Sequence, residues 1–128
     1  MDQAPRILLV EDEQLIAIGA QSALEDGGYE VAHVATGHAA IAELEIGISN
    51  FVALVTDIRL GQGPDGWEVA RRARHLSATL PIVYVSGDSA ADWPSQGVPN
   101  SIMLSKPYAE AQLLQAVTQL ANARPQEI

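Results

Sequence analysis

Short apolar runs alternate about five times with longer segments of helical periodicity. The runs are rich in leucine or β-branched residues, as strands are, and cover residues 7–10, 29–34, 52–56, 82–85 and 101–104. Between them, apolar residues three or four positions apart mark one helical face, most regularly over 16–24 and 113–121 and more weakly over 40–48 and 69–76. Residues 7–10 contain no polar side chain, which is typical of a strand covered on both faces. The alternation predicts an α/β fold, with a parallel sheet between two layers of helices.

Glycine and proline mark the ends of the predicted elements. Gly27-Gly28 ends the first helix, and Asp65-Gly66 can cap the start of the third. The segment after the fourth strand breaks the pattern, because residues 89–93 could form only a short helix before Pro94 and residues 95–100 contain further glycine and proline. We therefore expect an irregular connection on this side of the molecule.

Length and composition limit the classes of protein that fit. The 128 residues suit one domain, and we expect a core over about 5–122, a short tail over 123–128 and no output domain. The 16 acidic and 7 basic residues give a formal charge of −9, which disfavours nucleic-acid binding. The absence of cysteine excludes disulfides, thiolate metal sites and cysteine nucleophiles. With no signal-peptide pattern and no apolar run near the ~18 residues that span a bilayer, we expect a cytoplasmic protein without membrane contact.

Polar side chains follow four of the predicted strands. Glu11, Asp12 and Glu13 come after the first strand, Asp57 after the third, Ser86 after the fourth and Lys106, the only lysine, after the fifth. The carboxyl ends of parallel strands share one edge of the sheet, where open α/β sheets bind ligands. Each position alone is explained by a strand end that emerges into water. Together, carboxylates, a hydroxyl and an ammonium suit metal-assisted phosphoryl transfer.

The carboxylates of this cluster need a cation. Two carboxylates about 4 Å apart repel by roughly 4 kcal/mol at an effective dielectric of 20, and Lys106 offsets only one charge. Oxygen ligands without histidine or cysteine favour a hard ion such as Mg²⁺. We infer that Glu11 and Asp12 hold the metal and that Asp57 coordinates it and attacks phosphorus. Lys106 and Ser86 would bind the oxygens of the transferred group.

Five motifs in order resemble those of two-component response-regulator receiver domains over essentially the whole chain. They are Ile7-Leu8-Leu9-Val10-Glu11-Asp12-Glu13, Val55-Thr56-Asp57-Ile58-Arg59-Leu60, Asp65-Gly66, Tyr84-Val85-Ser86-Gly87 and Lys106-Pro107. The resemblance implies a flavodoxin-like (βα)5 fold, with a doubly wound sheet of strand order 2-1-3-4-5. It also implies a cis peptide bond between Lys106 and Pro107.

The resemblance implies a role for each matching residue. Asp57 is the phosphoacceptor, Glu11 and Asp12 bind Mg²⁺ with the backbone carbonyl of Arg59, Ser86 is the hydroxyl switch, and Lys106 contacts the phosphoryl group. The phosphoryl donor is a phosphohistidine on a sensor histidine kinase or a phosphotransfer protein. The response is a conformational change at the face formed by the fourth helix, the fifth strand and the fifth helix.

The same resemblance indicates what kind of protein this is. A receiver catalyses its own phosphorylation and dephosphorylation and is not a conventional enzyme. Since no output domain is expected, we predict a stand-alone regulator or phosphate sink that acts on an unknown downstream protein. We expect a monomer or a weak, phosphorylation-dependent dimer. The alternative is a receiver cut from a longer hybrid histidine kinase.

Two segments depart from the common receiver pattern. Met103 stands three residues before the lysine, where an aromatic residue usually relays phosphorylation, and we expect it to pack. Tyr84 and Gly87 flank Ser86 much as in single-domain receivers whose fourth strand reads Phe-Ala-Thr-Gly. Such receivers are often partnered with alphaproteobacterial kinases of the HWE type. The segment here reads Tyr-Val-Ser-Gly.

Arg59 and Asp88 each lie two residues beyond a predicted site residue. We hypothesise that they pair across the mouth of the pocket and set the lifetime of the acyl phosphate. Exposed pairs are worth only about 0–1 kcal/mol, so two solvated side chains are the simpler interpretation.

Two other functions fit an acidic edge of an α/β sheet. A Mg²⁺-dependent phosphatase with an aspartyl-phosphate intermediate typically has a second acid two residues after the nucleophile, where this chain has Arg59. A flavodoxin-like electron carrier needs a loop rich in hydroxyl groups and glycine after the first strand, where this chain has residues 11–13, all acidic.

The remaining polar and aromatic residues have structural explanations. His33, His38 and His75 do not fall at strand ends with the acids. Trp67 is expected to pack, and Trp93 either packs or forms a contact surface. The only basic cluster, Arg71, Arg72 and Arg74, is either a solvated helix face or a surface that steers an acidic partner.

Overall fold

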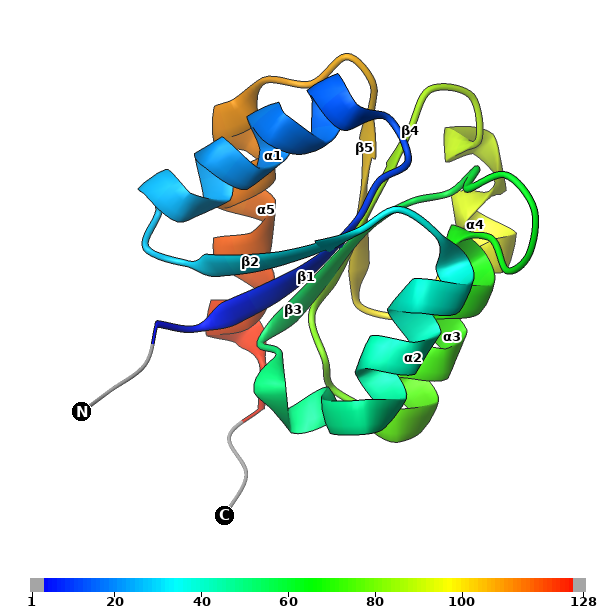
Figure 1. Cartoon of the computed structure of the whole chain (residues 1–128), viewed down its shortest axis with the longest axis horizontal. Helices are drawn as coiled ribbons and strands as arrows, with labels where there is room; N and C mark the ends of the chain where they lie inside the picture. The colour runs from blue at the N-terminus through cyan, green and yellow to red at the C-terminus, as the bar shows by residue number, and fades with distance from the viewer. Residues whose placement is uncertain (1–3, 126–128) are drawn as a thin grey trace.

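Five parallel strands form one sheet in the order β2-β1-β3-β4-β5, which confirms the predicted topology (Figure 1). The computed structural model describes residues 4–125. Its strands are β1 (Arg6–Val10), β2 (Glu30–Val34), β3 (Ala53–Asp57), β4 (Ile82–Ser86) and β5 (Ser101–Ser105). Every bound lies within one residue of the predicted run. The central strands β1, β3 and β4 are buried at all or all but one of their residues, whereas the edge strands β2 and β5 are mostly half-buried.

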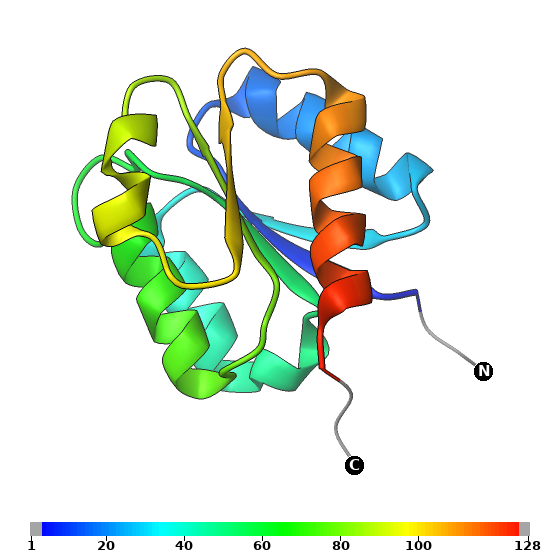
Figure 2. The same ribbon diagram turned by 180° about the vertical axis from the view of Figure 1, so that it is seen from behind.

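Helices cover both faces of the sheet, as predicted. They are α1 (Gln14–Asp26), α2 (Gly37–Gly47), α3 (Gly66–Leu76), α4 (Trp93–Gln96) and α5 (Glu110–Ala123), with 3₁₀ turns η1 (Ile48–Asn50) and η2 (Ala90–Asp92). Helices α1 and α5 pack together on one face, and α2 and α3 pack together on the other (Figures 1 and 2). Strands β3 and β4 are consequently buried at every residue.

Alternate strand residues divide the core into two layers. In β1, Leu8 and Val10 pack on the side of α2 and α3, whereas Ile7 and Leu9 pack on the side of α1 and α5. Full burial of such a side chain contributes about 1.5–3 kcal/mol. The central strands therefore hold the carboxyl edge of the sheet in a fixed position.

Two helix ends match the predicted turn residues. Gly27 is the C-cap of α1, and Gly28 has a φ of 97°, in the left-handed region that glycine tolerates. Asp65 caps α3, because its side chain accepts a hydrogen bond from the N–H of Glu68 at 3.0 Å. This cap fixes the start of α3 close to the loop that follows β3.

The connection between β4 and β5 is irregular, as predicted, but Pro94 does not end the helical segment there. It lies inside α4, within its first turn. Proline lacks an N–H, and the N–H groups of a first turn have no helical acceptor, so Pro94 fits. Side chains hold the segment: Trp93 Nε1 donates to Ser101 Oγ at 3.0 Å, and the Val98 N–H donates to the Tyr84 hydroxyl at 3.1 Å.

Three further expectations concern the Lys106–Pro107 peptide bond, membrane-spanning helices and the C-terminal tail. The Lys106–Pro107 peptide bond is cis, as the resemblance implied. None of the helices within residues 4–125 has both the length and the hydropathy of a bilayer-spanning segment. Of the predicted tail, residues 126–128 lie outside the described residues.

Candidate functional site

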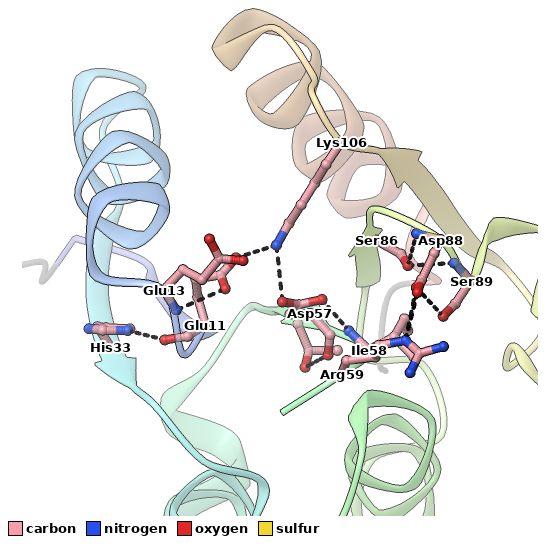
Figure 3. A network of polar contacts seen from close by, with 11 residues as sticks. Glu11, Glu13, His33, Asp57, Ile58, Arg59, Ser86, Asp88, Ser89 and Lys106 are labelled. Atoms are coloured by element: carbon pink, nitrogen blue, oxygen red, sulfur yellow. Dashed lines mark hydrogen bonds and ion pairs between the residues drawn. The ribbon is translucent and has the colours of Figure 1, made fainter. Parts of the chain in front are cut away.

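The sheet brings the predicted site residues to one edge (Figure 3). Glu11 directly follows β1, and Lys106 directly follows β5. Asp57 and Ser86 are the last residues of β3 and β4, whereas the sequence placed them just after these strands. The sheet ladder extends one residue further than the apolar runs, so both side chains are anchored by strand pairing.

Four acids gather at this edge. Glu11, Asp12, Glu13 and Asp57 each offer a carboxylate oxygen, and these oxygens all lie within 4.8 Å of one another. Glu11 and Asp57 are buried, whereas Asp12 and Glu13 are exposed. The predicted carboxylate cluster therefore exists, with a buried half and a half that faces water.

Lys106 lies between the two buried carboxylates (Figure 3). Its Nζ is 3.0 Å from Glu11 Oε1 and 3.0 Å from Asp57 Oδ2. Burial lowers the pKa of Lys106, but its hydrogen bonds to the two carboxylates and their charges outweigh burial and raise that pKa above its ordinary value. Lys106 is therefore protonated and positively charged at the centre of the cluster.

Glu11 holds its negative charge at a cost. Its side chain is 1% exposed, and burial, assisted by the charge of Asp57, raises its pKa to about 7. Lys106 and the Glu13 N–H, which donates to Glu11 Oε2 at 3.2 Å, oppose that shift. Lys106 Nζ, at 3.0 Å, is the ion-pair partner of Oε1, and no other group within residues 4–125 donates to this oxygen. A buried carboxylate oxygen that has only the lysine as a partner, among three other carboxylates, suits a hard cation such as Mg²⁺.

The two oxygens of Asp57 have different partners. Oδ1 accepts a hydrogen bond from the Ile58 N–H at 2.7 Å, and Oδ2 accepts one from Lys106 Nζ. The backbone is fixed as well, because Thr56 Oγ1 donates to the Asp57 carbonyl at 2.8 Å. A Cβ added at Gly66 would lie 2.1 Å from that carbonyl oxygen, so α3 can approach β3 only with glycine there. This explains the Asp65-Gly66 motif physically.

Ser86 contributes its hydroxyl to the same edge. Its side chain is 1% exposed, and Oγ accepts hydrogen bonds from the Asp88 N–H at 3.2 Å and the Ser89 N–H at 2.8 Å. The hydroxyl therefore lies against the loop between β4 and η2 (Figure 3).

Arg59 and Asp88 pair, as hypothesised. Arg59 Nε lies 2.8 Å from Asp88 Oδ2 and donates to Oδ1 at 3.0 Å. The hydrogen bonds from Arg59 and then from Ser89 lower the pKa of Asp88. Both side chains line an open pocket of about 370 Å³ that also includes Asp12, Glu13, Asp57, Ser86, Gly87 and Lys106. A Mg²⁺-dependent phosphatase would have an acid at position 59. The arginine there binds Asp88 across the pocket, which disfavours the phosphatase alternative.

Two of the predicted modulators, Tyr84 and Met103, pack in the core together with the two tryptophans. Met103 is opposite Tyr84 in the β4–β5 pair and packs against the cluster between the sheet and α3. Trp67 is buried with its ring centroid 4.7 Å from that of Tyr84. Trp93 is partly buried against the same cluster. Met103 and Trp67 therefore pack, as expected, and Trp93 combines packing with a hydrogen bond.

One site contact was not predicted. His33 was set apart from the acids, but its Nε2 lies 2.8 Å from the backbone oxygen of Glu11. The parallel pairing of β1 with β2 places His33 opposite Leu9, two residues before Glu11. The sequence does place His33 as the polar residue nearest the end of the second strand, which suggests a position close to the site. Its partner could not be predicted, because it depends on a strand register that the sequence does not specify.

The basic cluster on α3 binds neighbouring segments. Arg72 forms an ion pair with Glu45, and Arg71 donates to Gln96 at 3.4 Å. Arg74 Nε donates to the Leu80 carbonyl at 2.7 Å, and its NH groups donate to the carbonyls of residues 99 and 100. These arginines connect α3 to α2, to α4 and to the segments that precede β4 and β5. The basic cluster therefore has a structural role, and no acidic partner protein is needed to explain it.

Comparison with known proteins decides the family. The model of the response regulator receiver domain matches residues 7–118, well over half of the chain. The chain belongs to the receiver-domain family. As a receiver domain it acts in two-component signalling, in which receivers interact with histidine kinases or phosphotransfer proteins.

Individual relatives agree with this assignment. The receiver is 33% identical over 120 residues to the response regulator receiver protein CpdR of Brucella abortus, covering 92% of this chain and 98% of that protein. It superposes with a TM-score of 0.93 and 48% identity on the crystal structure of a response regulator receiver protein from Sinorhizobium medicae, covering 96% of this chain and 98% of that one.

Other relatives carry the receiver in different settings. The receiver domain of the sensor histidine kinase PA1611 from Pseudomonas aeruginosa, with a magnesium ion coordinated in its active-site cleft, matches with a TM-score of 0.80 and 25% identity over 94% of this chain and 99% of that one. The receiver spans 27% of a longer transcriptional regulatory protein and 13% of a sensor protein that are also similar to it.

Proposed function

We propose that this receiver accepts a phosphoryl group on Asp57 from a phosphohistidine of a sensor histidine kinase or a phosphotransfer protein. The observation that carries the proposal is the carboxylate of Asp57, buried at the base of an open pocket and held by Ile58 and Lys106. An Asp57 oxygen forms the bond to phosphorus while the bond between phosphorus and the histidine nitrogen breaks, and the imidazole leaves. Fixed positioning of the nucleophile is the protein's main contribution to such a transfer.

The acid cluster supports Mg²⁺ as the cofactor. Glu11, Asp12 and Asp57 would hold the ion with the backbone carbonyl of Arg59, and Glu11 Oε1 is the buried oxygen that such an ion would satisfy. Bound Mg²⁺ supplies positive charge between the carboxylates and the phosphoryl oxygens. The magnesium ion in the cleft of the PA1611 receiver favours the same metal here.

Lys106 and Ser86 would stabilise the phosphorylated state. Lys106 Nζ already donates a hydrogen bond to Asp57 Oδ2. It therefore lies close enough to donate one to an oxygen of a phosphoryl group on the same side chain. Ser86 would donate its hydroxyl proton to a second phosphoryl oxygen. The resulting movement of the loop after β4 would alter the face formed by α4, β5 and α5, with Tyr84, Gly87, Met103 and Pro107 as modulators.

The receiver would act as a signalling module and not as a conventional turnover enzyme. CpdR, a protein of nearly the same length, favours a stand-alone cytoplasmic regulator or phosphate sink that switches a downstream protein, either as a monomer or as a weak dimer after phosphorylation. The similarity to a sensor protein favours the second candidate, a receiver within a longer hybrid kinase. The partial likeness to the Phe-Ala-Thr-Gly receivers makes HWE-type kinases the first donors to assay.

Binding of beryllofluoride, a phosphoryl mimic, tests the proposal. In Mg²⁺ the wild-type receiver should bind beryllofluoride, detected by ¹⁹F nuclear magnetic resonance, and Asp57→Asn should not. Equal binding by the two proteins, or no binding by either, would exclude Asp57 as the phosphoacceptor.

A further inference from the structure

The hydroxyl of Ser86 is held by the loop that follows β4. Ser86 Oγ accepts hydrogen bonds from the N–H groups of Asp88 and Ser89, at 3.2 and 2.8 Å. Ser86 and Ser89 are both buried, so water does not readily replace these bonds. Both hydrogen bonds that Oγ accepts come from the loop, as Figure 3 shows.

The loop is in turn tied to the segment that carries the phosphoacceptor. Ser89 Oγ donates to Asp88 Oδ1 at 3.0 Å, and the Asp88 carboxylate pairs with Arg59 Nε at 2.8 Å. Arg59 follows β3, two residues after Asp57. A continuous chain of contacts thus runs from Arg59 through Asp88 and Ser89 to the Ser86 hydroxyl (Figure 3).

We propose that Arg59 and Asp88 form a latch that holds the Ser86 hydroxyl in the loop and opposes the phosphorylated conformation. The inference rests on the proposed function, in which Ser86 Oγ binds an oxygen of the group on Asp57. The Ser86 O–H proton is free to donate while Oγ accepts both loop bonds, so the latch acts on the position of Oγ. It holds Oγ against the loop, and movement of Oγ towards the group on Asp57 disturbs the contacts to Asp88 and Ser89. Arg59 and Asp88 are positioning residues, since they act through Ser86.

The size of the effect is bounded by the exposure of the pair. The side chains of Arg59 and Asp88 are 75% and 56% exposed, and exposed pairs are weak. Loss of the latch should therefore strengthen beryllofluoride binding by about two- to fivefold. A latch of this strength biases the switch and still permits phosphorylation.

Two substitutions that remove charges of opposite sign distinguish the latch from a purely electrostatic effect. Arg59→Ala makes the pocket more negative and should weaken binding of an anion, whereas Asp88→Ala makes it less negative and should strengthen binding. The latch predicts that both variants bind beryllofluoride more tightly than the wild type. Arg59→Lys, which can still pair with Asp88, should bind with nearly wild-type affinity.

The experiment measures beryllofluoride affinity in Mg²⁺ by ¹⁹F nuclear magnetic resonance, with Arg59→Ala and Asp88→Ala each made alone and in a Ser86→Ala background. The latch predicts that the gain in affinity disappears when Ser86 is alanine, because no hydroxyl remains to be released. Opposite effects of the two substitutions, or the same gain in both backgrounds, would overturn the latch while leaving Asp57 as the acceptor. Failure of the wild type to bind, or binding by Asp57→Asn, would instead refute the proposed function on which the latch depends.

Discussion

At the scale of single residues, the site depends on an imbalance of charge. Four carboxylates face one ammonium, and the most buried of the four, Glu11, has a pKa of about 7. In the unfolded chain the same carboxyl has its ordinary pKa of 4.5. The folded, metal-free protein therefore binds the Glu11 proton more tightly than the unfolded chain does.

The stability of the metal-free receiver should depend on pH through Glu11. A raised folded-state pKa contributes stability that is fully present below pH 4.5 and is lost as the pH rises through about 7. We expect the free energy of unfolding to fall across this window by on the order of 2 kcal/mol relative to Glu11→Gln, which cannot ionise at this position. Denaturant titrations of both proteins in a chelator, from pH 5 to 8, would measure the difference. Parallel pH profiles would contradict the assignment.

Lys106 should matter more for the response than for the chemistry. Its ammonium is 3.0 Å from Asp57 Oδ2, so it can follow a phosphoryl group placed on that side chain. In Lys106→Ala we expect phosphorylation by acetyl phosphate to persist, at a reduced rate, while the accompanying change at the α4–β5–α5 face is largely lost. Amide chemical shifts recorded with and without beryllofluoride would report that change. A full response in Lys106→Ala would show that the lysine is dispensable for switching.

At the scale of elements, close approach of α3 to β3 positions the site. The Cβ that alanine would add at Gly66 meets the Asp57 carbonyl oxygen at 2.1 Å, so one of the two elements must move. We expect Gly66→Ala to destabilise the fold by about 1–3 kcal/mol and to weaken beryllofluoride binding.

Gly19 in α1 offers a matched control. A Cβ there meets no atom nearer than Glu110 Oε1, at 3.4 Å, so Gly19→Ala should stabilise the receiver by about 0.5–1 kcal/mol through helix propensity. Thermal or denaturant unfolding of both variants would check the opposite signs. If Gly66→Ala were also neutral or stabilising, the close approach would not be what positions Asp57.

The short α4 segment depends on one buried hydroxyl. Tyr84 is fully buried, burial raises its pKa, and its oxygen accepts the hydrogen bond from the Val98 N–H. Tyr84→Phe keeps the packing against Trp67 but leaves a buried N–H without its partner, which costs about 1–3 kcal/mol. In Tyr84→Phe we expect amide hydrogen exchange at Val98 and its neighbours to be faster than in the wild type, whereas exchange in β1 should be unchanged. Unchanged exchange at Val98 would mean that Tyr84 serves only as packing.

At the scale of the whole molecule, topology explains what was predictable. The gathering of Asp57, Ser86 and Lys106 at one edge follows from five apolar runs separated by helices, because parallel strands end on the same side. The strand order follows only from the resemblance to receiver domains. The burial of Glu11, its contact with His33 and the direction of the Ser86 hydroxyl do not follow from that pattern. They depend on strand register and on loop hydrogen bonds between residues far apart in the sequence.

The same distinction explains the correction at α4. Proline ends a helix in its interior but fits a first turn, and the sequence alone does not show in which turn Pro94 lies. The Arg59–Asp88 pair was foreseen because both residues occupy equivalent positions after neighbouring strands, which topology brings together.

The site of phosphorylation tests the proposed role of Asp57 most directly. The receiver would be incubated with acetyl phosphate and Mg²⁺, trapped by reduction with borohydride, and mapped by mass spectrometry of its peptides. We predict modification at Asp57, dependence on Mg²⁺ and no modification in Asp57→Asn. Modification of another acid of the cluster in the wild-type protein, or undiminished modification of Asp57→Asn, would contradict that role.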